Sequence, residues 1–392
     1  MILVRIISTG IQVFFCLKIT AFKGLGKACP ENSFESLIEK FKNMKKLLFI
    51  SMVVLATTNA QAKIWRVNNN AGIVADFSSL TAAVSSASVL SGDTIHVEPS
   101  ATVYGGPTLS KQLVIIGNGY FLTGAGGNSG LQATTSESTV SDMTFANGSA
   151  GTKLIGLVLS NNSFAAGYNG NVNITFEKCR FTGIAPVNFV NRAETFSNIV
   201  LRKCFFATAA TTWQAASTTL NNVTIENSIF ASSVTFLTGA GTLNFVFRNN
   251  HITGVASLSN AYVANSVFAS ASQNTFTSCN VKNNLFVVNQ TGVTTGPLST
   301  NGNNLVSQTL ASIIVNTGSD DGKFQLAAGS PAIGGGVDIS GTKPDCGAFG
   351  GTDPYKLSGI PGIPTIYALT VPASIPLATP TMNVTISTRN NN

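Results

Sequence analysis

The chain is short of charged residues. Asp, Glu, Lys and Arg make up only 10% of its 392 residues. The formal net charge of +7 is concentrated near the N-terminus, because residues 1–62 hold eight of the 23 Lys and Arg but only three of the 16 Asp and Glu. The remaining residues carry 15 basic and 13 acidic side chains, a net charge of +2. This near-neutral segment argues against a nucleic-acid or membrane-surface partner, since both select for clustered basic residues.

Metal ligands and catalytic clusters are scarce as well. The chain has two histidines, His96 and His251, and no Cys-x-x-Cys pair, so we expect neither a metal centre nor another cofactor. Polysaccharide hydrolases need paired carboxylates, and lyases need carboxylates that hold Ca²⁺ beside a basic residue. Between residues 143 and 284 the acidic residues are only Glu177, Glu194 and Glu226. We therefore expect that the protein is not an enzyme.

The sequence contains instead an eight-residue repeat motif, here called the phrase, that recurs with different residues. Its form is apolar, any residue, apolar, two polar residues, a small polar residue or Cys, any residue, and usually an aromatic. The clear copies are 174–181, 199–206, 223–230, 245–252, 261–268 and 279–286, and weaker ones are 138–145 and 157–164. We call the small residue the anchor. Successive anchors are 16 to 25 residues apart, and they are Met143, Asn162, Cys179, Cys204, Ser228, Asn250, Ser266 and Asn284.

A repeat of roughly 20 residues predicts a solenoid, in which each unit stacks on its neighbour because it cannot bury a core alone. The apolar residues of the phrase are two apart, which places both on one face of a strand. A helical repeat would need apolar residues three and four apart, and no copy has them. The sequence therefore predicts an all-β parallel β-helix with one coil per repeat, and a β-sandwich is the alternative.

The anchor is expected to form the bend between two strands of a coil. Asn tolerates left-handed dihedrals best among residues other than Gly, and stacked Asn side chains can hydrogen-bond along the axis of the solenoid. Cys179 and Cys204 share this position in consecutive coils, about 4.8 Å apart, within the reach of a disulfide. One alternative is a disulfide between them, and the other is two buried thiols. Cys279 matches the inward Ile174 and is expected in the core.

The polar position before the bend predicts a second vertical row. Glu177, Arg202, Glu226 and Arg248 share it in successive copies. One interpretation is an acid–base site in which Arg202 lies between two carboxylates. The alternating sign is better explained by a surface ladder of charges that stabilises the stacking of coils.

Segments on both sides of the repeat carry a family resemblance. Ser91-Gly-Asp-Thr-Ile-His-Val97 leads into the first strands, and Gly329-Ser-Pro-Ala-Ile333 followed by Asp345-Cys-Gly-Ala-Phe349 closes them. Residues 64–356 resemble the right-handed parallel β-helix proteins of the pectate-lyase-like superfamily, in a bacterial secreted branch. The resemblance implies a right-handed solenoid with a short N-terminal capping helix, for which we expect Asp76 as the N-cap. It implies little about function, since this scaffold hosts many activities.

The N-terminal 62 residues are expected to lie outside the fold. Residues 44–62 have a charged start, an apolar stretch and the ending Ala60-Gln-Ala62, which predicts a signal peptide cleaved between Ala62 and Lys63. Residues 1–43 then precede the signal peptide, and we interpret them as a start-site artefact or a disordered leader. A membrane anchor over residues 2–19 is the alternative, but polar residues interrupt it.

The C-terminal residues 357–392 change character. Prolines punctuate an apolar segment, and 382–388 alternate as one more strand. Two strands do not make a domain of their own. We expect them to cap the β-helix of residues 63–356 along its last coil, where an open edge would otherwise invite aggregation.

These features predict a secreted or cell-surface, monomeric, non-catalytic scaffold that binds a glycan or a partner surface. The alternatives are a polysaccharide lyase or glycoside hydrolase of the same fold, and a structural adhesin component. Trp213, expected in a long loop, is a weak candidate for stacking on a sugar. Asp320 and Asp321 form the one adjacent carboxylate pair in the solenoid, which we expect in a solvated loop.

Overall fold

The structure is a computed structural model of the whole chain. It describes residues 2–4, 15–17, 62–168, 170–188, 194–208, 211–215, 219–238, 243–291, 300–338, 341–374 and 381–391.

The chain divides into two compact units, residues 1–61 and residues 62–392. In the first unit β1 (Ile2–Val4) pairs antiparallel with β2 (Phe15–Leu17). The second unit begins at Ala62, beside the predicted signal-peptide cleavage site, and cleavage itself stays a prediction. Over the described residues, no helix has the length and apolar character needed to cross a membrane.

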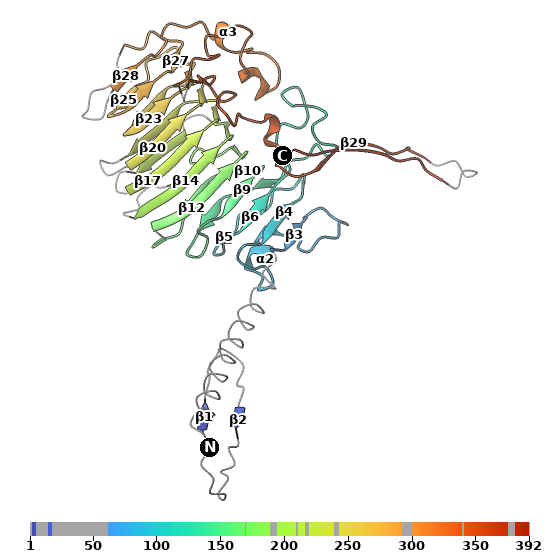
Figure 1. Cartoon of the computed structure of the whole chain (residues 1–392). Helices are drawn as coiled ribbons and strands as arrows, with labels where there is room; N and C mark the ends of the chain where they lie inside the picture. The colour runs from blue at the N-terminus through green and yellow to red at the C-terminus, as the bar shows by residue number, and fades with distance from the viewer. Residues whose placement is uncertain are drawn as a thin grey trace, which may run out of the picture. The chain divides into compact units, whose positions relative to one another are not determined.

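The second unit is a parallel β-helix (Figure 1). Its largest sheet, here the long sheet, stacks eleven parallel strands from successive coils. In chain order they are β3 (Ile64–Val67), β4 (Thr94–Val97), β6 (Val114–Ile116), β9 (Lys153–Ile155), β12 (Gly170–Glu177), β14 (Thr195–Arg202), β17 (Thr219–Glu226), β20 (Leu243–Arg248), β23 (Ala261–Ala264), β26 (Asn280–Lys282) and β28 (Thr300–Gly302).

A second sheet, here the narrow sheet, is made of two-residue strands that follow the bend. They are β7 (Thr139–Val140), β10 (Val158–Leu159), β13 (Arg180–Phe181), β15 (Phe205–Phe206), β18 (Ile229–Phe230), β21 (His251–Ile252), β24 (Val267–Phe268) and β27 (Leu285–Phe286).

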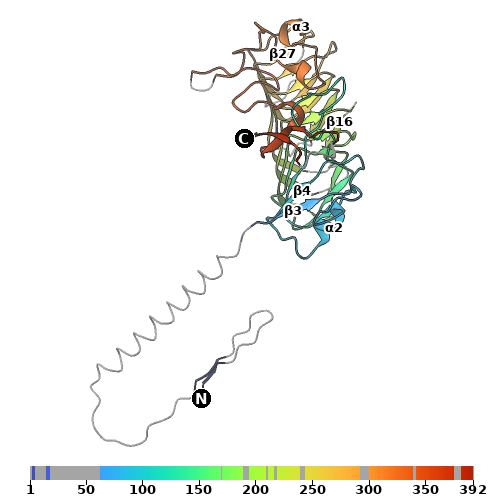
Figure 2. The ribbon, with the colours of Figure 1, turned by 90° about the vertical axis from the view of Figure 1, so that its right-hand side faces the viewer.

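Two shorter parallel sheets complete the coils. Their strands are β5 (Thr108–Leu109), β8 (Met143–Phe145) and β11 (Asn162–Phe164) in one, and β16 (Thr211–Ala215), β19 (Val234–Thr238), β22 (Ala256–Ser259) and β25 (Thr275–Thr277) in the other. Figure 2 shows α2 (Leu80–Ser85) beside β3 and β4 at one end of the stack, and α3 (Leu310–Ile313) near β27 at the other.

The predicted register is confirmed for the six clear copies. Ile174 pairs with Ile199, Ile199 with Val223, and Val223 with Phe245. All four side chains are buried, as are the aromatic residues that close the phrase. Phe206 and Phe230, for example, stack with ring centroids 4.2 Å apart. Apolar positions two apart therefore build one continuous core along the solenoid.

The register predicted for the two weaker copies is wrong. Val158 pairs with Arg180, and Asn162 pairs with Met143 in another sheet, so Asn162 does not stack on Cys179.

The bend is formed one residue earlier than predicted. The left-handed residues are those just before the anchors, with φ between 48° and 55°, and we call them the corner column: Lys178, Lys203, Asn227, Asn249, Asn265 and Asn283. The prediction that the anchor itself is left-handed was wrong. Asn fits the corner because its short side chain tolerates positive φ better than most.

The anchors instead point inward and saturate backbone groups. Asn250 is fully buried, accepts from the Ser228 N–H at 3.0 Å and donates to the Ile225 carbonyl at 3.0 Å. Asn284 does the same for the Ser266 N–H and the Val263 carbonyl. The sharp turn takes these groups out of the strand ladder, and a buried unpaired backbone group is costly, so a small polar side chain is required here.

An amide bond of the kind predicted for the anchors joins Asn284 to Asn304 of the next coil at 3.0 Å, and a longer amide ladder occurs on an exposed row. Asn198, Asn222 and Asn244 are left-handed and hydrogen-bond side chain to side chain along the axis, at 3.1 Å and 3.0 Å. This row lies within β14, β17 and β20 of the long sheet. Ladders of this kind add cohesion between coils.

The C-terminal part of the unit covers the outer face of the narrow sheet. The outward positions of that sheet are mostly apolar and form a second core with residues from 310 to 355; these positions are Val158, Arg180, Phe205, Ile229, His251, Val267 and Leu285. The partners that cover them include Ile314, Phe324, Cys346 and Tyr355. The closing residues near 332 and 346–348 are thus buried because they pack on this face.

A C-terminal strap, residues 335–338 and 341–359, then runs back along the corner column. Asn283 donates to the Gly335 carbonyl at 3.0 Å, and Asn227 donates to the Gly350 carbonyl at 2.7 Å. Lys203 forms an ion pair with Asp353. The strap ends in the short 3-10 helix η2 (Leu357–Gly359). The strap contacts the coils in reverse order, from the last toward the first, and so carries the chain back toward the first coils.

That return decides where the terminal strands lie. β29 (Thr365–Thr370) and β30 (Thr385–Arg389) form an antiparallel hairpin. The Ala133 N–H donates to the Ile366 carbonyl at 2.8 Å and Arg389 donates to the Leu131 carbonyl at 2.6 Å, so the hairpin contacts the loop before β7. The prediction that these strands cap the last coil is therefore wrong, because the strap carries the chain back along the corner column before the hairpin begins.

Two local predictions need correction. Ser79, not Asp76, caps α2, with its hydroxyl accepting from the Ala82 N–H, whereas Asp76 accepts from the Arg66 N–H. Asp321 is fully buried at the start of the 3-10 helix η1 (Gly322–Phe324), rather than solvated.

Buried hydrogen bonds hold the Asp321 carboxylate in place. The Ser358 N–H donates to it at 2.6 Å and the Tyr355 hydroxyl at 3.2 Å. The buried loop therefore ties the strap to the solenoid.

Candidate functional site

The outer face of the long sheet is the most extended surface that the repeat builds. One row of half-buried outward residues runs along it in continuous register: Thr175, Val200, Thr224, Val246, Tyr262 and Asn280. Equivalent side chains recur about every 4.8 Å, so an extended ligand can meet the same kind of group in successive coils. From Thr175 to Asn280 the row is uncharged and mixes polar and apolar side chains, whereas the exposed Lys153 continues it on the preceding strand.

The charged row is the predicted ladder. Glu177, Arg202, Glu226 and Arg248 lie in register on neighbouring strands. Arg202 binds Glu177 at 2.6 Å and Arg248 binds Glu226 at 2.7 Å. Partial burial works against ionisation of Arg202, but the hydrogen bond to Glu177 together with the charges of Glu177, Asp353 and Glu226 outweighs it and raises the pKa of Arg202. Each carboxylate of the row is thus neutralised by its own arginine.

A small crevice lies where this row meets the strap. Its volume is about 180 Å³, and it is lined by Glu226, Arg248, Asn249, Thr352 and Asp353 among others. Asp353 approaches the row from far along the chain and already pairs with Lys203. The crevice therefore holds hydrogen-bonding groups whose charges are mutually compensated.

The remaining acidic residue of the repeat region lies away from the row. Glu194 precedes β14, and its side chain accepts from the Gly167 N–H at 3.3 Å. Arg202 ends the same strand, so eight residues of extended chain separate them. The carboxylates that the sequence offered for catalysis do not converge. Within the described part of the chain, no group of three His, Cys, Asp or Glu residues is placed to hold a metal ion.

A larger groove opens over the first coils. Its volume is about 740 Å³, and it lies between the outer face of β3 and β4 and the base of the hairpin. Its floor is polar, with Arg66, Asn68, His96 and Glu98, and an apolar wall includes Ile366. Such a mixture of apolar walls and a few polar groups is common in ligand sites.

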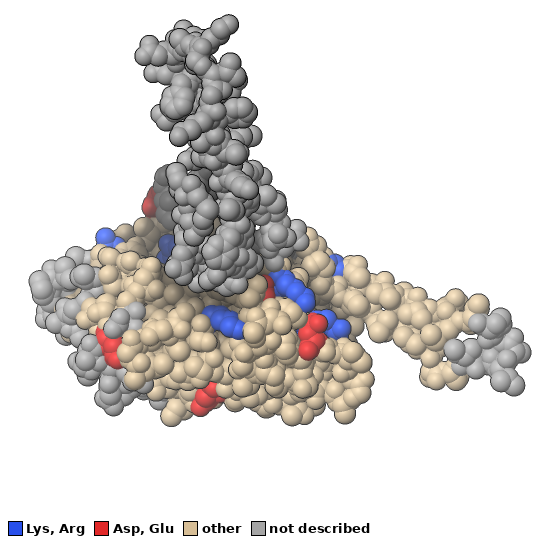
Figure 3. Space-filling view, turned by 90° about the horizontal axis from the view of Figure 1, so that it is seen from below, with Lys and Arg blue, Asp and Glu red and all other residues tan. Residues whose placement is uncertain are grey.

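The polar groups of this groove bind one another. Arg66 donates to Glu98 at 2.5 Å and Asn68 donates to it at 2.6 Å. Burial alone would raise the pKa of Glu98, but these hydrogen bonds outweigh it and lower that pKa. Burial lowers the pKa of His96, so its imidazole is neutral at pH about 7. Figure 3 shows how few charged side chains the surface seen from below carries.

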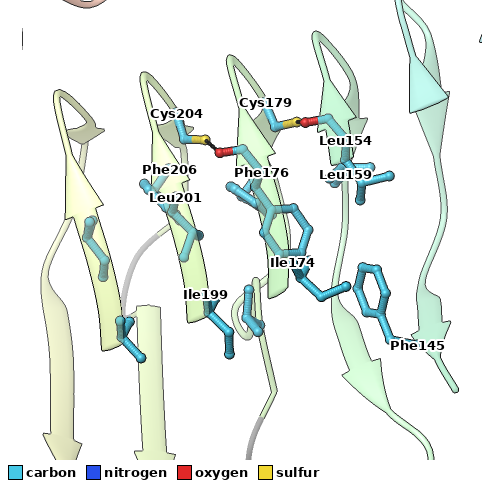
Figure 4. Packing of buried hydrophobic residues seen from close by; sticks show 14 of the residues in the cluster. Phe145, Leu154, Leu159, Ile174, Phe176, Cys179, Ile199, Leu201, Cys204 and Phe206 are labelled. Carbon is cyan, nitrogen blue, oxygen red and sulfur yellow. Dashed lines mark hydrogen bonds between the residues drawn. The ribbon is translucent and has the colours of Figure 1, made fainter. Parts of the chain in front are cut away.

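The cysteines lie in the core rather than in a site. Figure 4 shows the Cys179 Sγ directed at the Leu154 carbonyl and the Cys204 Sγ at the Phe176 carbonyl, at 3.4 Å and 3.5 Å. Both are free thiols in the structure, as is the buried Cys279. Burial raises the pKa of Cys179 to about 12, which leaves it unreactive.

Trp213 lies on a strand rather than in a loop. It is in the middle of β16, where it pairs with Phe236 of β19. Its side chain lies outside the described part of the structure, so its role in stacking on a sugar stays a prediction.

Sequence reasoning missed the groove, the crevice and the covered face of the narrow sheet. The groove and the crevice depend on C-terminal residues that fold back over coils formed much earlier in the chain. The covered face had a signal. The position between anchor and aromatic is apolar in four of the six clear copies, such as Phe205, Ile229 and Val267, although an exposed strand face would favour polar residues there.

No protein-family description, no curated protein and no solved structure matches the chain.

Proposed function

We propose that the protein is an exported, monomeric, non-catalytic scaffold that binds an extended, uncharged glycan along the outer face of the long sheet. One observation carries the proposal. The ion pairs of the ladder neutralise Glu177, Arg202, Glu226 and Arg248, while the row beside them offers hydroxyl, amide and apolar groups at regular spacing from Thr175 to Asn280. Uncharged sugars are recognised through such hydrogen bonds and through stacking on aromatic rings.

Tyr262 provides the aromatic surface of this row. It is half-buried, next to Val246 in one coil and Asn280 in the next. A phenol ring in that place offers both an apolar face and a hydroxyl. The groove over the first coils extends the same outer face, and its neutral polar floor suits the same class of ligand.

A glycan array probed with the purified protein tests the proposal. We expect binding to neutral, linear polysaccharides. Tyr262→Ala should weaken binding about fivefold, in line with the loss of one aromatic contact. Tyr367→Ala, the same change on the exposed hairpin, is the matched control and should bind as the unmodified protein does.

The same samples discriminate the alternatives. Release of reducing ends or of unsaturated sugars from a bound polysaccharide would identify a hydrolase or a lyase and overturn the non-catalytic part of the proposal. Self-association in sedimentation, without any binding on the array, would instead indicate a structural surface component.

A further inference from the structure

A buried imidazole interrupts the apolar column on the outer face of the narrow sheet. His251 lies in register between Ile229 and Val267 and is 1% exposed. Neither of its ring nitrogens has a hydrogen-bond partner among the described residues. Phe324 packs on the ring, with centroids 4.6 Å apart. Native structures rarely leave buried polar atoms unpaired, so a ring with two such atoms indicates a partner other than the protein itself.

A cavity borders this ring. Its volume is about 320 Å³, and it lies between the narrow sheet and the segment that carries α3 and η1. A water molecule occupies about 30 Å³, so the space exceeds a single water several-fold and reaches the lower range of ligand pockets. Leu310, Ile314 and Phe324 contribute an apolar wall.

The polar groups around the cavity favour an anion. Thr253, Asn316 and Lys323 line it together with His251. Burial lowers the pKa of His251 to about 3, so at neutral pH the ring is uncharged and offers one N–H donor and one acceptor. The Lys323 ammonium supplies the positive charge. Its pair with Asp320 is long, 3.8 Å, and both side chains are substantially exposed, so the pair competes weakly with a ligand.

We propose that this cavity binds a small carboxylic acid with an apolar body. The carboxylate is directed at His251 and Lys323, and the apolar body lies against Leu310, Ile314 and Phe324. This site is separate from the outer face of the long sheet and does not depend on glycan binding there. The carboxylate of the ligand gives the buried imidazole a hydrogen-bond acceptor that the described residues do not provide.

Phenylacetate is a suitable probe, because it combines a carboxylate with a compact aromatic body. His96 and His251 are the only histidines of the chain, so the imidazole region of an NMR spectrum reports on both separately. We expect phenylacetate to shift the His251 signals saturably, to leave those of His96 unchanged, and to raise the melting temperature of the full chain. The neutral analogue 2-phenylethanol should bind about tenfold more weakly, because it lacks the charge.

Two variants locate the site. His251→Phe keeps a ring in the apolar column and should fold, which circular dichroism checks, but should lose about tenfold or more in affinity for phenylacetate. Lys323→Gln should lose several-fold, and only for the acid, not for the alcohol. His96→Gln is the matched control and should bind normally.

Three results would overturn the proposal. One is equal affinity for phenylacetate in the folded His251→Phe variant. Another is a shift confined to His96. The third is a lack of saturation up to about 10 mM phenylacetate.

Discussion

The outer faces of the two main sheets have opposite characters although the same coils build both. On the long sheet, the outward residues mix polar, charged and a few apolar side chains, most of them partly exposed, and the charges of the ladder neutralise one another along the axis. On the narrow sheet, the outward residues are largely apolar and lie beneath the C-terminal segment. The difference teaches that a solenoid coil can present a binding surface on one side and a second core on the other.

The largest expected contrast comes from placing the same charge on each face. Val267→Lys buries an ammonium in the second core, whereas Val246→Lys places it on the half-exposed row of the long sheet. We expect Val267→Lys to lower the free energy of unfolding by about 5 kcal/mol, or to abolish folding, and Val246→Lys to change it by less than about 1 kcal/mol. Urea unfolding measures both. Similar losses for the two variants would show that the two faces are equally buried.

Acid should act on the covered face through His251. Its pKa in the folded state is about 3, below the value of about 6.5 expected in the unfolded chain. The unfolded state therefore binds the proton first, and the free energy of unfolding falls as the pH drops from about 6.5 to about 3, by about 4 kcal/mol in all.

The His251→Phe variant isolates this effect. It should lose that part of the pH dependence, because a phenyl ring has no proton to bind. Chemical denaturation at several pH values gives the slope. If the slopes of the variant and of the unmodified protein agree, the imidazole is not excluded from water as the structure has it.

The loss in free energy of unfolding should differ less between a buried amide and an exposed one than between the two lysine variants. Asn250→Ala removes the acceptor of the Ser228 N–H and the donor to the Ile225 carbonyl, both buried, and should cost about 2–3 kcal/mol. Asn171 accepts one bond from Asn198 on the exposed row, so Asn171→Ala should cost about 0.5 kcal/mol. Thermal and urea unfolding compare the pair, and a larger loss for Asn171→Ala would contradict the assignment of the anchor as the interior support of the bend.

The charged row should contribute least. Arg202→Gln breaks the ion pair with Glu177, whose side chains are 39% and 16% exposed for Arg202 and Glu177 respectively. We expect a loss of no more than about 1 kcal/mol, which shrinks further as salt is added. Unfolding at low and high ionic strength measures it. A loss that salt leaves unchanged would mean that the row is a buried network rather than a surface ladder.

The repeat could be predicted from the sequence because its signal is local and periodic. Apolar residues two apart, followed by a bend, identified the strands, and their spacing identified the register of Glu177 with Arg202. The bend was misplaced by one residue because both the corner and the anchor are often Asn. Only coordinates distinguish Asn249, which turns the chain, from Asn250, which supports the turn from inside.

The candidate sites divide in the same way, into a row that the repeat predicts and two pockets that the C-terminal segment completes. The charged row was predicted, since each coil contributes one residue at one position of the phrase. The groove beside His96 and the cavity beside His251 were not, because each needs side chains from the C-terminal segment. Asp321 illustrates the cause: its neighbours in sequence suggest a solvated turn, yet Tyr355 and Ser358 arrive from elsewhere and bury it.

The sequence alone was enough to predict the coil: which residues face inward, which positions stack in the clear copies, and the place of each bend to within one residue. These properties depend on the strand period and on residue-specific dihedral preferences, which act over a few residues. Only the tertiary structure decided which outer face stays open. The C-terminal segment covers the outer face of the narrow sheet rather than that of the long sheet, because burying an apolar row releases more free energy than burying a polar one.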